Sequence, residues 1–183
     1  PETLQTARDF GITTLNDTKN YGLSLVLGGG AVNLLELTSA YGVFATEGNY
    51  ILPVSILKIT DVDGNIVEQN TKRPRKVLDT QIARQINNIL SDNNARLLTF
   101  GVNSLLNMGN RPIAVKTGTT NDRRVNWAVG WSRSVAVGAW VGNNDNSPMK
   151  QVVSGVSGAS PIWRRIILEA LKKYPAENFD IPA

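Results

Sequence analysis

The 183-residue chain is long enough for one domain with a sizeable core, and its 42% hydrophobic and 19% charged residues are typical of a globular protein. The net charge of +4 is spread along the chain without a basic block interleaved with aromatics, so no nucleic-acid partner is predicted. The chain has no Cys and no His, which excludes disulfides, thiolate nucleophiles, Ser-His-Asp triads and imidazole ligands. Acid–base chemistry must therefore use Lys, Asp, Glu or Tyr, and no metal or cofactor is expected.

No apolar run approaches the roughly 18 residues of a membrane span. The opening PETLQTARDF, without a basic n-region, is expected to lie inside a domain.

The first part of the chain is predicted to hold a helix and a hairpin. Residues 22–30 form an apolar run closed by three glycines, which predicts a turn into a helix. Asn33 and Glu36 have the spacing of a capping box for that helix. Apolar residues then recur at helical spacing up to Gly48: Leu34, Leu37, Tyr41 and Phe44. The β-branched run at residues 50–59, followed by the Asp-Gly turn of DVDGN, predicts a β-hairpin.

A second helix is predicted to begin after the cap Asp79 and to carry four apolar residues on one face: Ile82, Ile86, Ile89 and Leu90. Three strands follow, at residues 111–119, 125–132 and 134–142, with a turn-prone stretch at 119–122. The link between the second and third strands, Ser132 to Ser134, is short enough only for an antiparallel pair.

A last helix is predicted to start with Ser160 as its cap and Pro161 at its first position. Two apolar rows run along it: Ile162, Ile166 and Ala170 beside Trp163, Ile167 and Leu171. The order of elements indicates an α/β fold of the α+β type, with helices packed on an antiparallel sheet in one domain that spans residues 1–183.

The main candidate site lies in IAVKTGTTNDRR, residues 113–124. A strand edge offers N–H and C=O groups to an extended peptide, and Thr117 and Thr119 place two hydroxyls on one face, where they can bind a carboxylate. Lys116 points the other way and supplies positive charge near a nucleophile, while the Thr119 N–H is a candidate oxyanion donor. Gly118 weakens a strand, which suggests close approach of a ligand or another backbone. A plain core strand with a solvated lysine at its end stays open as the alternative.

Lys-Thr-Gly is one of three motifs that together mark a class of serine enzymes, the others being S-x-x-K with the nucleophile and S-x-N. Ser55 to Lys58 and Ser91 to Asn93 match those two literally. The first match lies in a predicted strand, where residues three apart face opposite sides about 10 Å apart, so Lys58 cannot activate Ser55. The second lies at a predicted helix end. We interpret both matches as structural.

Several stretches resemble the C-terminal half of the transpeptidase domain of class A penicillin-binding proteins, in family order and over residues 9–171: GLSLVLGGGAVNLLELTSAYGVFATEG, ILSDNNARLLTFG, KTGTTNDRRVNWAVGW, VGAWVGNNDNSPM and SGVSGASPIWRRI. The resemblance implies a D,D-transpeptidase that cross-links peptidoglycan stem peptides through an acyl-serine and is acylated by β-lactams. It assigns Lys116, Thr117, Gly118 and Thr119 to the substrate-binding strand, with Thr117 and Thr119 meeting the carboxylate and the Thr119 N–H in the oxyanion hole. It also implies a membrane-anchored parent protein on the outer side of the bacterial inner membrane.

In that family the S-x-x-K helix and the S-x-N loop precede the segment with which this chain begins. We therefore expect no catalytic serine in this chain, which alone should be inactive. Its expected partner is the N-terminal half of the domain, in the same polypeptide or as a separate chain. The alternatives are a non-catalytic transpeptidase-like binding module and a serine β-lactamase fragment, which shares the Lys-Thr-Gly motif.

Overall fold

The structure is a computed structural model that describes residues 2–16, 21–120, 122–150 and 157–183. Asn121 of the predicted turn and residues 154–156 of the last family-like stretch lie outside these ranges. The helices are α1 (Glu2–Asp9), η1 (Leu23–Leu27), α2 (Leu34–Ala45), α3 (Thr80–Ser91), α4 (Leu97–Phe100), α5 (Ala159–Ala170) and η2 (Leu171–Lys173). The strands are β1 (Asn49–Tyr50), β2 (Lys58–Thr60), β3 (Ile66–Gln69), β4 (Arg75–Lys76), β5 (Ala114–Thr119), β6 (Val125–Trp131) and β7 (Ala136–Gly142).

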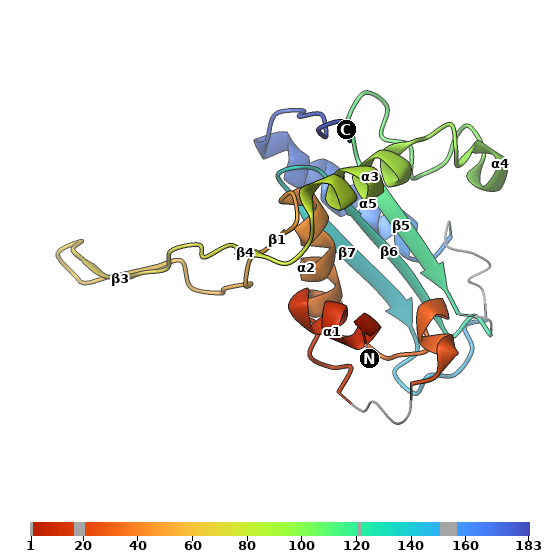
Figure 1. Ribbon diagram of the computed structural model, residues 1–183, viewed down its shortest axis with the longest axis horizontal. Helices are drawn as coiled ribbons and strands as arrows, with labels where there is room; N and C mark the ends of the chain where they lie inside the picture. The colour runs from red at the N-terminus through yellow and green to blue at the C-terminus, as the bar shows by residue number, and fades with distance from the viewer. Residues whose placement is uncertain (1, 17–20, 121, 151–156) are drawn as a thin grey trace.

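An antiparallel sheet of order β5-β6-β7 forms the middle layer of the body, as the sequence predicted (Figure 1). The link between β6 and β7 is a tight turn, in which the Ser132 N–H donates to the carbonyl of Val135 at 2.8 Å. Lys116 lies opposite Val129 in the register of β5 and β6. Because β6 lies between the other two strands, its residues are half-buried or buried throughout. In the described residues β5 is an edge strand of this sheet.

Helix α5 covers one face of the sheet with only one of its two predicted apolar rows. Trp163 and Ile167 are fully buried, whereas Ile162 and Ile166, in the other row, remain 46% and 48% exposed. The predicted start was wrong: α5 begins at Ala159, after Gly158 as the cap. The physical reason is that the Asn126 side chain, from β6, accepts a bond from the Ala159 N–H and takes over the role expected of Ser160.

Helices α2 and α3 cover the other face, and their predicted caps are confirmed. The side chain of Asn33 accepts from the Leu35 N–H at 2.8 Å, and Asp79 accepts from the Gln81 N–H at 2.7 Å. The prediction of a capping box was wrong, because the Glu36 carboxylate does not bond to Asn33. It accepts instead from the backbone and hydroxyl groups of two residues after α1, Thr13 and Thr14, at 2.7 to 3.2 Å. Glu36 therefore ties α2 to the chain segment that precedes it.

An aromatic cluster joins these helices to β6. The ring of Trp131 lies 5.6 Å from that of Phe44 and 5.1 Å from that of Tyr41, and the Trp131 side chain is fully buried. Its indole N–H donates to Asn87 Oδ1 at 2.8 Å, and Asn87 Nδ2 donates to the Phe44 carbonyl at 2.9 Å. One buried amide thus joins α2, α3 and the sheet.

The apolar face predicted for α3 is only partly covered. Ala83 and Asn87 are the residues of α3 that are buried, and Ile82 and Ile89 remain 47% and 62% exposed. The sheet and α2 meet α3 along the line of Ala83 and Asn87, which leaves the outer part of the apolar face open among the described residues.

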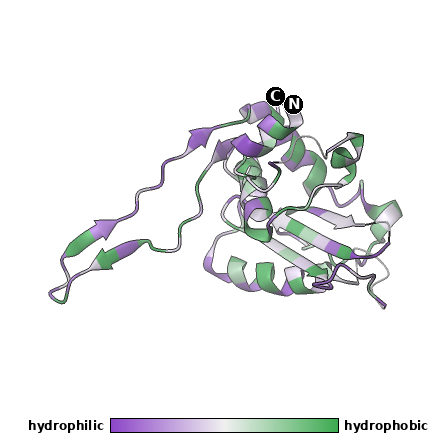
Figure 2. Ribbon diagram, turned by 90° about the horizontal axis from the view of Figure 1, so that it is seen from below, coloured by the Kyte–Doolittle hydropathy of each residue, from purple (hydrophilic) through white to green (hydrophobic). Residues whose placement is uncertain are grey.

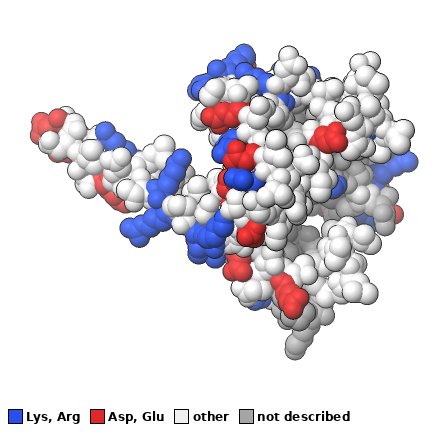
Figure 3. All heavy atoms as spheres, turned by 45° about the horizontal axis from the view of Figure 1, so that its top comes forward, with Lys and Arg blue, Asp and Glu red and all other residues white. Residues whose placement is uncertain are grey.

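Residues 51–74 form a long arm that projects from the body (Figures 1 and 2). Its far end is the predicted hairpin of β2 and β3, with Asp61 accepting from the backbone of Asp63 and Asn65 in the turn. Acidic side chains cluster at this tip and basic ones nearer the body (Figure 3). The strand predicted at residues 50–59 was too long, because residues 51–57 lie along the exposed arm outside any strand. No helix in the described part of the chain has the length and apolar character to cross a membrane.

The predicted turn into a helix at residues 22–30 is a short 3-10 helix, η1. It ends at Gly28, which adopts φ of 92° in the left-handed region that glycine favours. Leu23 and Leu27 on this helix are more than 90% exposed.

Candidate active site

The free edge of β5 presents the backbone groups of Thr117 and Thr119. Two backbone hydrogen bonds at the ends of β6 show which of its residues turn their N–H and C=O groups towards β5 and which towards β7. One joins Ser132 to Val135, and the other runs from the Thr120 N–H to the Val125 carbonyl at 3.2 Å. Because antiparallel pairs alternate, Lys116 and Gly118 turn their N–H and C=O groups towards β6. Thr117 and Thr119 turn theirs outward, away from the sheet. The N–H of Thr119, the predicted oxyanion donor, therefore lies on the open edge.

The side chains of the four predicted residues alternate across the strand, as expected. Thr117 lies opposite Ala128 and Thr119 opposite Asn126, on the face that α5 covers. Lys116 lies opposite Val129, on the face of α2 and α3, and its side chain is exposed. Its Nζ donates to the Thr117 carbonyl at 2.5 Å, which places positive charge directly on the free edge.

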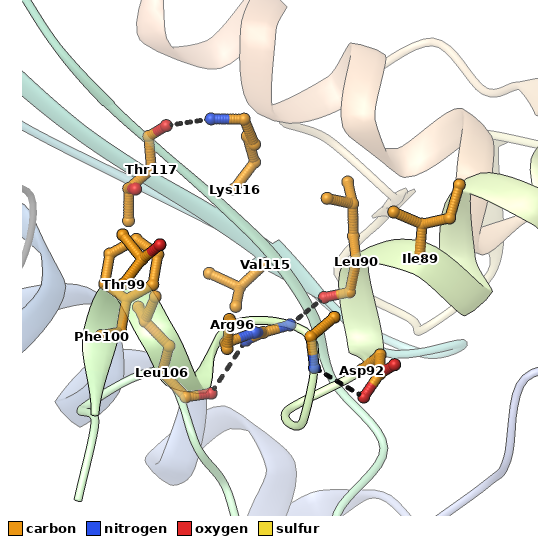
Figure 4. A pocket seen from close by; sticks show the side chains of 11 residues that line it. Ile89, Leu90, Asp92, Arg96, Thr99, Phe100, Leu106, Val115, Lys116 and Thr117 are labelled. Atoms are coloured by element: carbon orange, nitrogen blue, oxygen red, sulfur yellow. Dashed lines mark hydrogen bonds between the residues drawn. The ribbon is translucent and has the colours of Figure 1, made fainter. Parts of the chain in front are cut away.

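A groove of about 250 Å³ runs along this edge (Figure 4). Lys116 and Thr117 line one end of it, and Arg96, Thr99 and Phe100 line the part formed by α4 and the turn before it. The sequence reasoning did not single out these last three residues, because nothing in their spacing ties them to the Lys-Thr-Gly strand. Val115 also lines the strand side, so both walls of the groove mix apolar and polar groups, and Thr119 is not among the lining residues.

Arg96 holds the groove wall together. Its guanidinium donates to the carbonyl of Leu90, at the end of α3, and reaches the carbonyl of Leu106 at 3.5 Å (Figure 4). Burial lowers the pKa of Arg96, and the nearby Asp92 carboxylate partly opposes this by favouring the charged form. The Asp92 carboxylate also accepts from the backbone N–H groups of Asn94 and Ala95, and these bonds stabilise the turn after α3.

Asn126 is a further residue that the sequence reasoning missed. It is fully buried on β6, where its Nδ2 donates to Thr119 Oγ1 at 2.9 Å and to the Gly118 carbonyl at 3.3 Å. Its Oδ1 accepts from the Ala159 N–H at 2.6 Å. The signal that could have found it is the polar residue inside the apolar run VNWAVGW, since a buried amide needs partners.

The space over Gly118 is open. A Cβ built there would have the Cβ of Trp127, at 3.7 Å, as its nearest described neighbour, which is ordinary contact. No positive φ is recorded at Gly118 either. Among the described residues, therefore, neither crowding nor backbone strain requires this glycine.

The literal matches to S-x-x-K and S-x-N, at Ser55 and Ser91, lie on the projecting arm and at the end of α3. Ser55 is an exposed residue at a bend of the projecting arm, and Lys58 is the exposed first residue of β2. Ser91 is the last residue of α3, and its hydroxyl donates to the Asn88 carbonyl at 3.4 Å. Ser55 therefore does not sit on a helix three residues before a lysine, and Ser91 ends a helix as predicted. That neither serine takes part in catalysis stays a prediction. Within the described ranges no three acidic side chains gather closely enough to hold a metal ion.

Comparison with solved structures first shows which known fold the chain has. The fold matches that of PonA1 from Mycobacterium tuberculosis with a TM-score of 0.84 at 22% identity, covering 100% of this chain and 52% of that chain. It matches penicillin-binding protein 1A from Haemophilus influenzae with a TM-score of 0.78 at 24% identity, covering 99% of this chain and 32% of that one. The fold is therefore that of penicillin-binding proteins, and the predicted mixture of helices and antiparallel sheet is confirmed.

The sequence then gives the family. Residues 10–167 match the model of the penicillin-binding protein transpeptidase domain. Penicillin-binding protein 1A of Aquifex aeolicus is 34% identical over 168 residues, which are 92% of this chain and 22% of the relative. Penicillin-binding protein 2D of Bacillus subtilis is 30% identical over 184 residues, 98% of this chain and 26% of the relative. This chain belongs to the penicillin-binding protein transpeptidase family, and it spans about a quarter or less of the length of these relatives.

Proposed function

We propose that this chain is the C-terminal part of a D,D-transpeptidase domain that cross-links peptidoglycan stem peptides by serine acyl transfer. Its role is to supply the substrate-binding wall: Lys116, Thr117, Gly118 and Thr119. The serine nucleophile, its activating lysine and the S-x-N pair belong to the N-terminal half of the same domain. β-Lactam antibiotics acylate the same serine, since their strained amide mimics the bond that the enzyme attacks.

The observation that carries this proposal is the orientation of Thr117 and Thr119 on the edge of β5. Their outward N–H and C=O groups can pair with an extended peptide, and their hydroxyls lie on a single face two residues apart. The outward Thr119 N–H can donate to the oxyanion of a tetrahedral intermediate, a contact whose loss typically costs about 3 kcal/mol. Lys116 adds positive charge at the free edge of β5, near the place that the nucleophile would occupy.

The expected position of the missing half is supported by apolar surface near the groove. Ile82 and Ile89 on α3 are about half exposed, and Leu98 on α4 is fully exposed. Exposed apolar residues in such a group mark a contact surface. We propose that the N-terminal half of the domain packs against them and brings its serine to the free edge of β5. Related proteins are bacterial, and we place the parent protein on the outer face of the inner membrane, where its peptidoglycan substrate is found.

The test is covalent labelling by a fluorescent penicillin, with this chain alone, with this chain plus the N-terminal half, and with the full-length parent protein. We expect labelling only where the N-terminal half is present, and mass spectrometry should place the label on a serine outside residues 1–183. A folded full-length protein that takes up no label would favour a non-catalytic binding module. Rapid release of the label by hydrolysis would favour a β-lactamase. Labelling of the isolated chain at Ser55 would refute the proposal.

A further inference from the structure

We propose that Asn126 is a positioning residue that directs the hydroxyl proton of Thr119 towards the carboxylate of the bound ligand. This inference rests on the proposed function, because it assumes that a carboxylate binds at the Thr119 side chain. It names a residue on β6, outside the Lys-Thr-Gly strand, as one determinant of the preference for ligands that carry that charge.

The three contacts of Asn126 fix which end of its amide faces which neighbour. The Ala159 N–H can only donate, and it lies 2.6 Å from the amide, so the atom that faces it must be the oxygen. The NH2 group then faces Thr119 Oγ1 at 2.9 Å and the Gly118 carbonyl at 3.3 Å. The Gly118 carbonyl can only accept, so its contact with the NH2 group supports the same orientation of the Asn126 amide. Asn126 is 0% exposed, so water does not compete for these bonds.

The orientation of the amide decides what the Thr119 hydroxyl can do. A hydroxyl has one proton to donate and two lone pairs that accept. Because the Asn126 NH2 group can only donate, Thr119 Oγ1 must be the acceptor of that bond. Its single proton is left for another acceptor, and Thr119 is exposed at the free edge of β5. A ligand carboxylate is the acceptor that such a hydroxyl binds best, because a bond to an ionised group is stronger than one to a neutral group.

The polarity of this chain of bonds begins at the N-terminus of a helix. Ala159 is the first residue of α5, a helix of 12 residues, and its N–H is one of the groups that have no partner within the helix. The bonds run from that N–H to the Asn126 oxygen, from the Asn126 NH2 to Thr119, and from the Thr119 hydroxyl to the ligand. Each donor polarises the next, so the positive end of the helix dipole favours donation to an anion.

Replacing the amide by a carboxylate reverses this polarity with almost no change in shape. In Asn126→Asp one oxygen keeps the Ala159 N–H, and the other can only accept, so the Thr119 hydroxyl must turn its proton inward. Asn126→Ala removes the bond altogether and leaves the hydroxyl free to rotate. We expect both variants to react more slowly with a penicillin that carries its carboxylate, by about tenfold to a hundredfold for Asn126→Asp and by less for Asn126→Ala.

The experiment measures second-order acylation rates of the full-length parent protein with a penicillin and with the methyl ester of the same penicillin. The wild-type protein should react faster with the acid, and the ratio of the two rates should fall in both Asn126 variants. Asn87→Ala is the matched control, because Asn87 is a buried amide on the opposite face of the sheet. It should lower the melting temperature and leave the ratio of rates unchanged.

A merely structural role for Asn126 would slow acid and ester equally, which would overturn the inference. An unchanged ratio in Asn126→Ala would overturn it as well, even if Asn126→Asp does not fold. Equal rates of acid and ester in the wild-type protein would also overturn it, while leaving the proposed function intact. No reaction of the folded wild-type protein with either compound would refute the proposed function itself.

Discussion

Substituting Gly118 by alanine tests whether this glycine is needed for the stability of the sheet or for the reaction of the complete active site with penicillin. The added Cβ would lie 3.7 Å from the Cβ of Trp127, an ordinary contact, so the sheet can accept it without strain. Glycine within a strand costs roughly 0.5–1 kcal/mol relative to alanine, so Gly118→Ala should leave stability unchanged or raise it by about that amount. Gly130 on β6 is the matched control, since its Cβ would lie 2.4 Å from the ring of Trp163. Gly130→Ala should therefore destabilise the domain by about 1–3 kcal/mol.

The assay combines urea unfolding of the full-length protein with its rate of acylation by penicillin. We expect Gly118→Ala to unfold at or slightly above the wild-type urea concentration and to be acylated at least about tenfold more slowly, a change of about 1.4 kcal/mol in the barrier. We expect this because a ligand or the segment that bears the serine should enter the open space over Gly118, where an added methyl group would obstruct it. A loss of stability in Gly118→Ala as large as that in Gly130→Ala would show that the glycine serves this chain's own packing. Wild-type acylation in a stable Gly118→Ala protein would show that nothing approaches it closely.

Two further predictions concern the body of the domain. Asn87→Ala leaves the Trp131 indole N–H and the Phe44 carbonyl without their buried partner, so the free energy of unfolding should fall by about 2–5 kcal/mol in urea titrations; a change below about 0.5 kcal/mol would contradict the role of that amide. The hydrogen bond and charge of Arg133 lower the pKa of Asp180 in the folded state. The Asp180 carboxylate therefore stabilises the fold fully above the unfolded pKa of about 3.9, and this stabilisation is lost as the pH falls through the lower, folded pKa. The melting temperature of Asp180→Asn should therefore lie below that of the wild type at pH 7 and converge with it in strong acid, and a gap that persists unchanged at pH 2 would contradict this.

Local chemistry accounts for the parts of the fold that the sequence predicted. Asn33 and Asp79 cap their helices with bonds to residues two positions later, and such short-range bonds are visible as spacing. The alternation in VNWAVGW and the short link after it define the meander of β5, β6 and β7 for the same reason. The edge position of the Lys-Thr-Gly strand also follows from this order.

Contacts between residues far apart in sequence account for the errors. Glu36 has the spacing to bond Asn33, yet Thr13 and Thr14 offer it more donors once α1 and α2 pack together. Asn126 provides from β6 the partner for the start of α5, so Ser160 is not needed as a cap. Neither competition leaves a periodic pattern in the sequence.

Burial could not be read from apolar rows alone, because these rows can face more than one partner. On α3 and α5 the spacing places Ile82, Ile89, Ile162 and Ile166 on apolar faces, and each of them is about half exposed in this chain. The groove residues Arg96 and Thr99 were invisible for a related reason. Their place beside Lys116 depends on how α4 and its flanking turns fold back on the strand.

A structure of the full-length parent protein acylated by penicillin tests the central claim most directly. The account predicts an ester to a serine outside residues 1–183, with the antibiotic carboxylate within hydrogen-bond distance of the Thr117 and Thr119 hydroxyls. The acyl carbonyl oxygen should lie about 3 Å from the Thr119 N–H. An acylated serine within this chain, or an antibiotic bound away from the free edge of β5, would contradict the account.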